Sequence, residues 1–259
     1  MRSEIEAASK RIAGYVRETP VMHLEPHFWS IDARLTLKLE QLQHTGSFKP
    51  RGAFNRILSN TVPPTGVIAA SGGNHGVAVA YVARQLGYRA EIFVPRVSSP
   101  VKVQRLRDYG ADVTIVGASY AEALLASQAR AAETGALVVH AYDQPEIVAG
   151  QGTLGREFAR QTPELDTVLL AVGGGGLMAG VAAWFAGEVR VIGVEPESAP
   201  TLAGALKAGE PVDVETGGVA ADSLGARRVG GLAFSLAQQY VERVGVVVCG
   251  GNADLSQLL

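Results

Sequence analysis

The chain has 259 residues, 47% of them hydrophobic, and a net charge of −2. This composition excludes a disordered chain, and it lacks the basic excess that nucleic-acid-binding proteins show. Cys249 is the single cysteine, which excludes an intrachain disulfide and a cysteine-rich metal site. The N-terminus is charged rather than a signal peptide, and no apolar run reaches the length of a membrane span. We therefore expect a cytoplasmic protein with one large domain or two smaller ones.

The first quarter of the chain contains helical and strand-like patterns. Apolar residues recur at helical spacing from Glu4, and Thr19-Pro20 ends this pattern because the residue before a proline disfavours the helical conformation. The predicted elements are a helix at 4–16, a strand at 35–40 and a helix at 53–58.

A turn-rich break at 61–66 separates this part from a regular alternation of short apolar strands and helices. Such alternation predicts right-handed βαβ units around a parallel sheet. We expect a small domain at 66–143, and a large domain formed by 1–65 together with 144–259. The predicted strands lie at 67–70, 90–94, 113–116, 137–139, 167–172, 190–194 and 244–248, and the helices at 74–86, 100–109, 120–133, 155–160, 177–186, 203–208 and within 230–243.

One lysine stands out in the stretch Gly46–Ala53, where Lys49 lies between Phe48 and Pro50 with a glycine on either flank. Pro50 suits the first turn of a helix, because its missing N–H costs nothing there. Lys49 is therefore expected where a turn enters a helix, beside a cleft. A lysine in such a place can act as a nucleophile or base if its pKa is lowered. These eight residues alone are equally compatible with an ordinary surface lysine.

Three glycine-rich turns follow predicted strands. The turn Ser71–Gly76 either caps the next helix through Ser71 or Asn74, or holds a carboxylate with its N–H groups. The run Gly173–Gly176 is costly to order, which favours a cradle for a phosphate over a plain turn. The turn Cys249–Asn252 either buries a thiol or places a neutral group opposite a ring nitrogen of a cofactor.

Two cofactors fit these turns. Gly174, Gly176 and Ala179 match a loose dinucleotide-binding fingerprint, and Glu195 ends the following strand, so a Rossmann-type NAD(P)-dependent oxidoreductase is one alternative. Pyridoxal 5'-phosphate is the other, because it needs a Schiff-base lysine, a phosphate cradle and a partner for its ring nitrogen. The oxidoreductase alternative leaves the lysine stretch and the cysteine turn unexplained.

Taken together, these stretches resemble the serine/threonine dehydratase family of pyridoxal-phosphate enzymes, in the fold group of the tryptophan synthase β subunit. The resemblance implies an α/β fold of type II, with two parallel-sheet domains, flanking helices and the cofactor between them. It implies β-elimination of L-threonine, and of L-serine, to a 2-oxo acid and ammonia. It also implies a homodimer that has a small amino-acid substrate and no nucleic-acid or membrane partner. The matching stretches are Gly46–Ala53, Ser71–Gly76, Ala149–Thr153, Gly173–Gly180 and Cys249–Asn252.

The resemblance also implies roles for single residues. Lys49 is the lysine that forms the Schiff base and later removes the Cα proton. Residues implied to hold the cofactor are Phe48, Lys49, Asn74, Gly173, Gly174, Gly175, Gly176 and Cys249, and those implied to bind the substrate are Ser71, Gly72, Asn74 and His75.

A first departure from the family bears on the alternative reactions of this scaffold, serine racemisation and hydroxyaspartate dehydration. Relatives that racemise serine carry a second serine where Gly72 stands, and that serine donates a proton on the opposite face. Glycine has no side chain that could replace it. The sequence therefore favours elimination with little racemisation.

A second departure concerns a divalent cation that some relatives bind through a glutamate, a backbone carbonyl and an aspartate. Glu195 and Ala199 match the first two positions, but Thr201 stands where the aspartate belongs. Because hard cations prefer carboxylate oxygens, this change weighs against a bound Mg²⁺ or Ca²⁺.

The third departure is the junction between Val244 and Gly245. Relatives have two further helices and a Glu-Pro-containing segment at this point, whereas here Val244 runs directly into the last predicted strand. Either the chain is shortened or this sequence lacks a stretch of the protein. The clean match on both flanks favours the second explanation.

Overall fold

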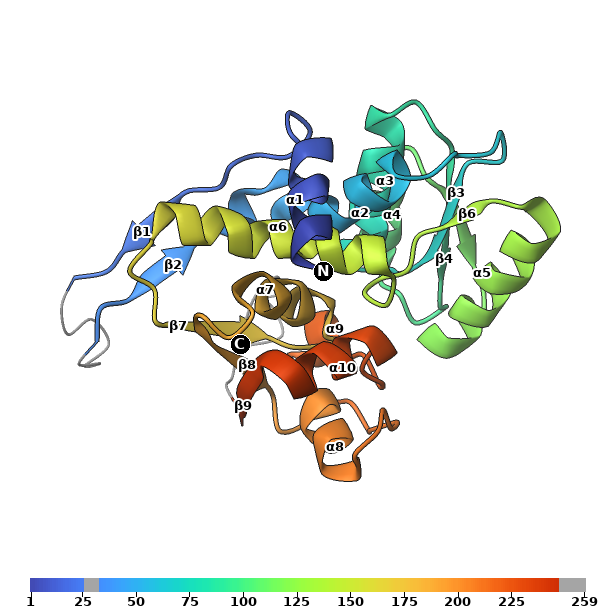
Figure 1. The fold of residues 1–259 in the computed structure, drawn as a ribbon. Coiled ribbons are helices and arrows are strands. Elements are labelled where there is room, and N and C mark those ends of the chain that lie inside the picture. Colours follow the sequence, from blue (N-terminus) through green and yellow to red (C-terminus); the bar gives the residue numbers. More distant parts are fainter. Residues whose placement is uncertain (26–32, 247–259) are drawn as a thin grey trace.

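Two parallel sheets organise residues 1–25 and 33–246, which the computed structural model describes (Figure 1). The strands are β1 (Val21–His23), β2 (Thr36–Lys38), β3 (Val67–Ala70), β4 (Ala90–Val94), β5 (Asp112–Ile115), β6 (Leu137–Val138), β7 (Thr167–Ala171), β8 (Arg190–Glu195) and β9 (Val241–Val246). One sheet has the order β5-β4-β3-β6 and the other the order β7-β8-β9, while β1 and β2 form a separate antiparallel pair.

Helices provide the crossovers that parallel strands require. None of the helices in the described ranges is both long and apolar enough to span a lipid bilayer. The α-helices are α1 (Arg2–Arg11), α2 (Lys49–Leu58), α3 (Asn74–Gln85), α4 (Pro100–Asp108), α5 (Tyr120–Thr134), α6 (Pro145–Gln161), α7 (Gly176–Phe185), α8 (Thr201–Ala208), α9 (Ala221–Leu224) and α10 (Gly231–Tyr240), and the 3-10 helices are η2 (Glu40–Leu42) and η3 (His44–Gly46).

The four-stranded sheet has the predicted βαβ alternation. Strand β3 is buried along its whole length, as expected for a strand that is covered on both faces, and it pairs in parallel with β4 and β6. The helices that follow have local start signals. Ser99 caps α4 by accepting from the N–H of Lys102, and Ser119 caps α5 by accepting from the N–H of Glu122.

Helix α6 is much longer than the helix predicted at 155–160. Glycines in its N-terminal half interrupt the helical pattern of the sequence, and the structure shows them to be contact points. A Cβ on Gly150 would lie 2.6 Å from the Arg51 carbonyl oxygen, and a Cβ on Gly152 would lie 2.8 Å from the Gly180 carbonyl oxygen. Glycine therefore lets α6 approach the backbones of both α2 and α7, which offsets its poor helix propensity.

Helix α1 ends at Arg11, five residues before the predicted end. Ile12 leaves the helical conformation with ψ near 0°, and Gly14 adopts a φ of +83°. Ile12 is nevertheless 1% exposed. The apolar pattern therefore continues beyond the helix, which explains the overestimate.

The apolar core has one main cluster for each sheet. One cluster packs α1, α6, α7 and α10 against β7 and β8, and the other packs α2, α3 and α4 against β3 and β4. Helix α6 contributes to both, with Val148 in the first cluster and Ile147 in the second. In Figure 1 this helix crosses the centre of the molecule, so it joins the two halves of the core.

The junction between Val244 and Gly245 lies inside β9. This strand pairs in parallel with β8, where Val244 is opposite Gly193 and Gly245 is opposite Val194. The register therefore continues across the junction. The predicted turn at Cys249–Asn252 lies outside the described residues.

Candidate active site

Lys49 is the first residue of α2, and Pro50 follows it in the first helical turn, as predicted. The backbone before it reverses through Thr45 and Gly46, which both have positive φ angles. The Lys49 amine donates a hydrogen bond of 2.8 Å to the Ala141 carbonyl oxygen. Burial, which no carboxylate of the described residues offsets, lowers the pKa of Lys49 to about 8. A substantial fraction of this amine is therefore neutral near physiological pH.

Two positions further along α2, Arg51 has the opposite environment. Its side chain is 1% exposed, and its guanidinium donates to both carboxylate oxygens of Glu40, at 2.7 and 2.8 Å, and to both of Glu157, at 3.0 Å. The Lys38 amine donates to Glu157 at 2.5 Å. Burial alone would lower the pKa of Arg51, but the two carboxylates raise it. We call Lys38, Glu40, Arg51 and Glu157 the charged floor.

The predicted substrate loop leads into α3. The Ser71 hydroxyl accepts from the Gly73 N–H at 3.2 Å, and α3 begins at Asn74. His75 is buried and its Nε2 donates to the Val139 carbonyl oxygen at 2.8 Å. Burial, assisted by the nearby Lys49, lowers the pKa of His75 to about 3. This imidazole is therefore neutral throughout the physiological range.

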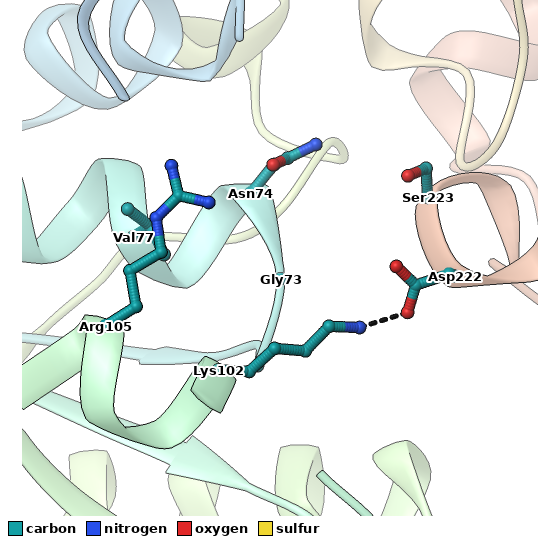
Figure 2. Close-up of a pocket in the computed structure, with 8 residues that line it drawn as sticks. Gly73, Asn74, Val77, Lys102, Arg105, Asp222 and Ser223 are labelled. Carbon is teal, nitrogen blue, oxygen red and sulfur yellow. Dashed lines mark hydrogen bonds and ion pairs between the residues drawn. The ribbon is translucent and has the colours of Figure 1, made fainter. Parts of the chain in front are cut away.

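A pocket lies beside this loop, between α3, α4 and α9 (Figure 2). Lys102 extends from α4 and pairs with Asp222 of α9 across the pocket. Arg105, one turn further along α4, donates to the Thr45 carbonyl oxygen at 3.0 Å. We call the Lys102–Asp222 pair and the Arg105 contact the mouth. The residues that line this pocket are Gly72, Gly73, Asn74, Val77, Lys102, Arg105, Asp222 and Ser223.

The run Gly173–Gly176 leads from β7 into α7. Gly175 has a φ of +88°, a Cβ on Gly174 would lie 2.2 Å from the Tyr142 ring, and a Cβ on Gly176 would lie 2.8 Å from the Tyr142 carbonyl oxygen. Glycine is thus required here by conformation and by close contact. Within the described ranges, the N–H groups of this run donate to no backbone carbonyl. Free N–H groups at the start of a helix form a site for an anion such as a phosphate.

These features fit pyridoxal phosphate. The aldehyde carbon of this group binds a neutral lysine amine, and its phosphate needs several N–H donors. Ala141 and Tyr142 are adjacent, and one contacts the Lys49 amine while the other contacts the glycine run. The structure thus connects these two predicted parts of the site through one loop. Cys249, the residue predicted to face the ring nitrogen, lies outside the described residues.

Glu195 has a structural role at the end of β8. Its buried carboxylate accepts from the N–H groups of Leu202, at 2.7 Å, and Ala203, at 2.9 Å, at the start of α8. Burial raises the pKa of Glu195 although these donors oppose the shift. In a dinucleotide-binding site the acidic residue at this position would bind the ribose. Here its carboxylate is engaged by α8, which weighs against the oxidoreductase alternative. The cation site at Glu195 and Ala199 stays a prediction, and the described part of the chain contains no cluster of three His, Cys, Asp or Glu side chains suited to a metal.

The fold and this site define a class of enzymes that attach a phosphorylated aldehyde to a lysine between two parallel-sheet units. A family model described as "Pyridoxal-phosphate dependent enzyme" matches residues 12–249. The chain belongs to this family. The predicted α/β fold class and the predicted cofactor are thereby confirmed.

Individual relatives are similar over nearly the whole chain. The L-threonine ammonia-lyases of Thermotoga maritima and Geobacter sulfurreducens are 36% and 37% identical to it over 93% and 94% of this chain. The chain spans 61% and 62% of the lengths of these two relatives. The structure of maize serine racemase matches with a TM-score of 0.88 and 35% identity, covering 95% of this chain and 76% of that one. A threonine deaminase isoform from Solanum lycopersicum matches with a TM-score of 0.86 and 31% identity, covering 96% and 75%.

Proposed function

We propose that this protein deaminates L-threonine, and L-serine, by β-elimination. Threonine loses its Cα proton and its β-hydroxyl, and the released enamine takes up water to give 2-oxobutanoate and ammonia. The same sequence converts serine to pyruvate and ammonia. The names of similar relatives support threonine as the substrate, and the chemistry of the Lys49 site supports the reaction type.

The Lys49 amine is the single observation that carries this proposal. When bound, pyridoxal phosphate supplies the electron sink that makes the Cα proton of an amino acid removable. Lys49 is the residue that takes this proton, because its lowered pKa of about 8 makes it a usable base near neutral pH. The nearby His75 is held neutral as a donor to a carbonyl, so it does not compete as a charged acid.

The loop Ser71–His75 orients the substrate. The N-terminus of α3 and the Ser71 hydroxyl present donors to the pocket that Arg105 and the Lys102–Asp222 pair also line, so the net charge of these three side chains is positive. A substrate carboxylate is stabilised in such a place by N–H groups and by the helix dipole. Binding by the carboxylate leaves the amino group and Cα free to face Lys49.

The direct test uses purified protein supplied with pyridoxal phosphate. We expect a visible absorbance band that borohydride abolishes, and stoichiometric release of ammonia and 2-oxobutanoate from L-threonine. Mass spectrometry after borohydride should locate the cofactor on Lys49. If the protein binds the cofactor at Lys49 but leaves threonine and serine intact, the proposed substrates are wrong and the assignment of Lys49 is retained.

Serine racemisation is the second candidate, because maize serine racemase is a close structural match. Gly72 argues against it, since glycine offers no side chain to donate a proton on the face opposite Lys49. We expect L-serine to give pyruvate with very little D-serine. A Cβ on Gly72 would lie 2.9 Å from the Ser98 hydroxyl oxygen, so a rotation of Ser98 would accommodate Gly72→Ser.

Gly72→Ser should therefore raise the yield of D-serine, and chiral chromatography of the serine that remains during turnover measures it. Gly72→Ala is the control, because it adds the Cβ without the hydroxyl. Abundant D-serine from the unmodified protein would show that another group supplies the second proton.

We also propose that the protein is a cytoplasmic homodimer. The support for this proposal is the resemblance to its family. Light scattering on the purified protein would measure twice the mass of one chain if the dimer is correct.

A further inference from the structure

The four residues 140–143 form a loop between β6 and α6 that sequence reasoning did not single out. Three of them contact different parts of the candidate site. The Ala141 carbonyl oxygen accepts from the Lys49 amine at 2.8 Å. The Tyr142 ring packs against Gly174, and its hydroxyl donates to the Arg228 carbonyl oxygen at 3.2 Å.

The third contact is made by Asp143. Its carboxylate accepts from the N–H groups of Gly231, at 3.0 Å, and Leu232, at 3.1 Å, which are orphan donors at the start of α10. The neighbouring Gly230 N–H donates to the Gly174 carbonyl oxygen at 3.1 Å. The loop therefore connects the lysine helix, the glycine run and α10.

His140 holds this loop in shape. Its Nδ1 accepts from two backbone N–H groups, that of Asp143 at 2.9 Å and that of Tyr142 at 3.3 Å. A backbone N–H can only donate, so Nδ1 carries no proton and the proton of the neutral ring is on Nε2. The ring also packs edge-on against the Tyr142 ring, with centroids 4.7 Å apart. One imidazole nitrogen thus holds the backbone N–H groups of two residues, Tyr142 and Asp143.

Gln144 closes the loop from its other end. Its side-chain oxygen accepts from the His140 N–H at 2.9 Å, and its side-chain nitrogen donates to the Val138 carbonyl oxygen at 3.2 Å. The loop is therefore a closed hydrogen-bonded unit. The acceptor at Nδ1 and the Gln144 side chain hold its shape.

We propose that His140 is a positioning residue for the cofactor, whose unprotonated Nδ1 folds residues 140–143 so that Ala141 meets the Lys49 amine and Tyr142 meets the glycine run. The Lys49 amine and the phosphate cradle are then aligned with each other before the cofactor arrives. Removing the acceptor lets the loop relax, which separates the two halves of the cofactor site and admits water to the amine. This inference rests on the cofactor of the family and not on the identity of the amino-acid substrate.

The test compares two substitutions of nearly equal polarity. His140→Asn places its side-chain oxygen where Nδ1 lies, the same number of bonds from Cα, whereas His140→Gln places it where Nε2 lies. We expect the asparagine variant to bind pyridoxal phosphate within about threefold of the unmodified protein. The glutamine variant should bind about tenfold more weakly or worse, since it loses both hydrogen bonds that Nδ1 accepts. The dissociation constant is measured by absorbance titration without any substrate.

A second readout needs no cofactor. Acetylation of Lys49, followed by peptide mass spectrometry at several pH values, measures the pKa of its amine in the cofactor-free protein. This pKa should stay near 8 in His140→Asn and rise toward the ordinary value of 10.5 in His140→Gln, because water then reaches the amine. A role confined to stability would leave it unchanged in both folded variants. His23→Asn is the control, since His23 is exposed and contacts Thr36 on the distant β1–β2 pair.

The two variants decide the proposal even if one of them is destabilised. Equal cofactor affinity and equal Lys49 reactivity in the two would overturn it, because the position of the acceptor would then not matter. An asparagine variant that folds but binds the cofactor as poorly as the glutamine variant would also overturn it.

Discussion

The charged floor around Arg51 and the mouth beside the substrate loop both rely on ion pairs, but they are built differently. In the floor, the side chains of Arg51, Glu40 and Glu157 are 1%, 12% and 12% exposed, and each carboxylate meets more than one donor. In the mouth, Lys102 and Asp222 are 38% and 41% exposed. Buried charges are strongly held once they are paired, whereas exposed pairs contribute little. The floor is therefore strongly held, whereas the ion pair at the mouth contributes little to stability.

Lys49 and Arg51 belong to the same helix, and their hydrogen-bond partners determine how firmly each holds its proton. Arg51 has two carboxylates and stays charged, while Lys49 has only a carbonyl oxygen and loses its proton readily. Because the floor already balances Arg51, its negative charges do not hold a proton on Lys49. The difference lies in partners and not in position, since both residues belong to the first turn of α2.

The largest expected effect comes from Lys49→Ala. Turnover should be abolished, because the group that carries the cofactor and the base are lost together. The free energy of unfolding of the cofactor-free protein should change little, because the lost hydrogen bond to the Ala141 carbonyl oxygen is offset by removing a buried amine that pairs with no carboxylate. Ammonia release and urea unfolding measure the two quantities. Near-normal deamination by this variant would refute the assignment of Lys49.

Arg51→Met should mainly destabilise the fold. It leaves Glu40 and Glu157 buried with a single cation, Lys38, and breaking such a buried network costs about 3–5 kcal/mol. The matched control is Arg89→Met, because the pair of Arg89 with Asp112 is 75% and 65% exposed and should contribute about 0–1 kcal/mol. Equal losses of unfolding free energy in the two variants would erase the contrast between buried and exposed pairs.

The third prediction concerns pH. The pKa of Lys49 is about 8 in the folded protein and 10.5 as its ordinary value, so between these values the unfolded chain holds a proton that the folded one has released. Stability rises with pH wherever the unfolded state binds more protons. The cofactor-free protein should therefore gain unfolding free energy from Lys49 between about pH 8 and 10.5. Urea unfolding across this range should show a gain that Lys49→Ala lacks.

The smallest effect is expected at the mouth. Lys102→Ala should change the unfolding free energy by less than about 1 kcal/mol, because the pair it breaks is exposed. Asp222→Ala should give a similar change, and the double variant should add little to either. A loss of unfolding free energy as large as that of Arg51→Met would mean that the exposed pair contributes as much to stability as the buried network does.

Much of this arrangement was predictable because it depends on local signals. The strands at 67–70 and 90–94 were predicted to the residue, and Pro50 correctly indicated the start of a helix at Lys49. The interactions that tune the site were not predictable, because they join distant parts of the chain. Lys38 and Glu157 are 119 positions apart, and Lys49 and Ala141 are 92 apart. No local pattern encodes such pairs.

The backbone contacts of α6 have a mechanical consequence. At Gly150 and Gly152 the backbone of this helix lies directly against the backbones of α2 and α7. A side chain at either glycine would force α2 or α7 away from α6 and would change the spacing between the lysine helix and the helix that follows the glycine run. The absence of two side chains therefore sets the width of this part of the site.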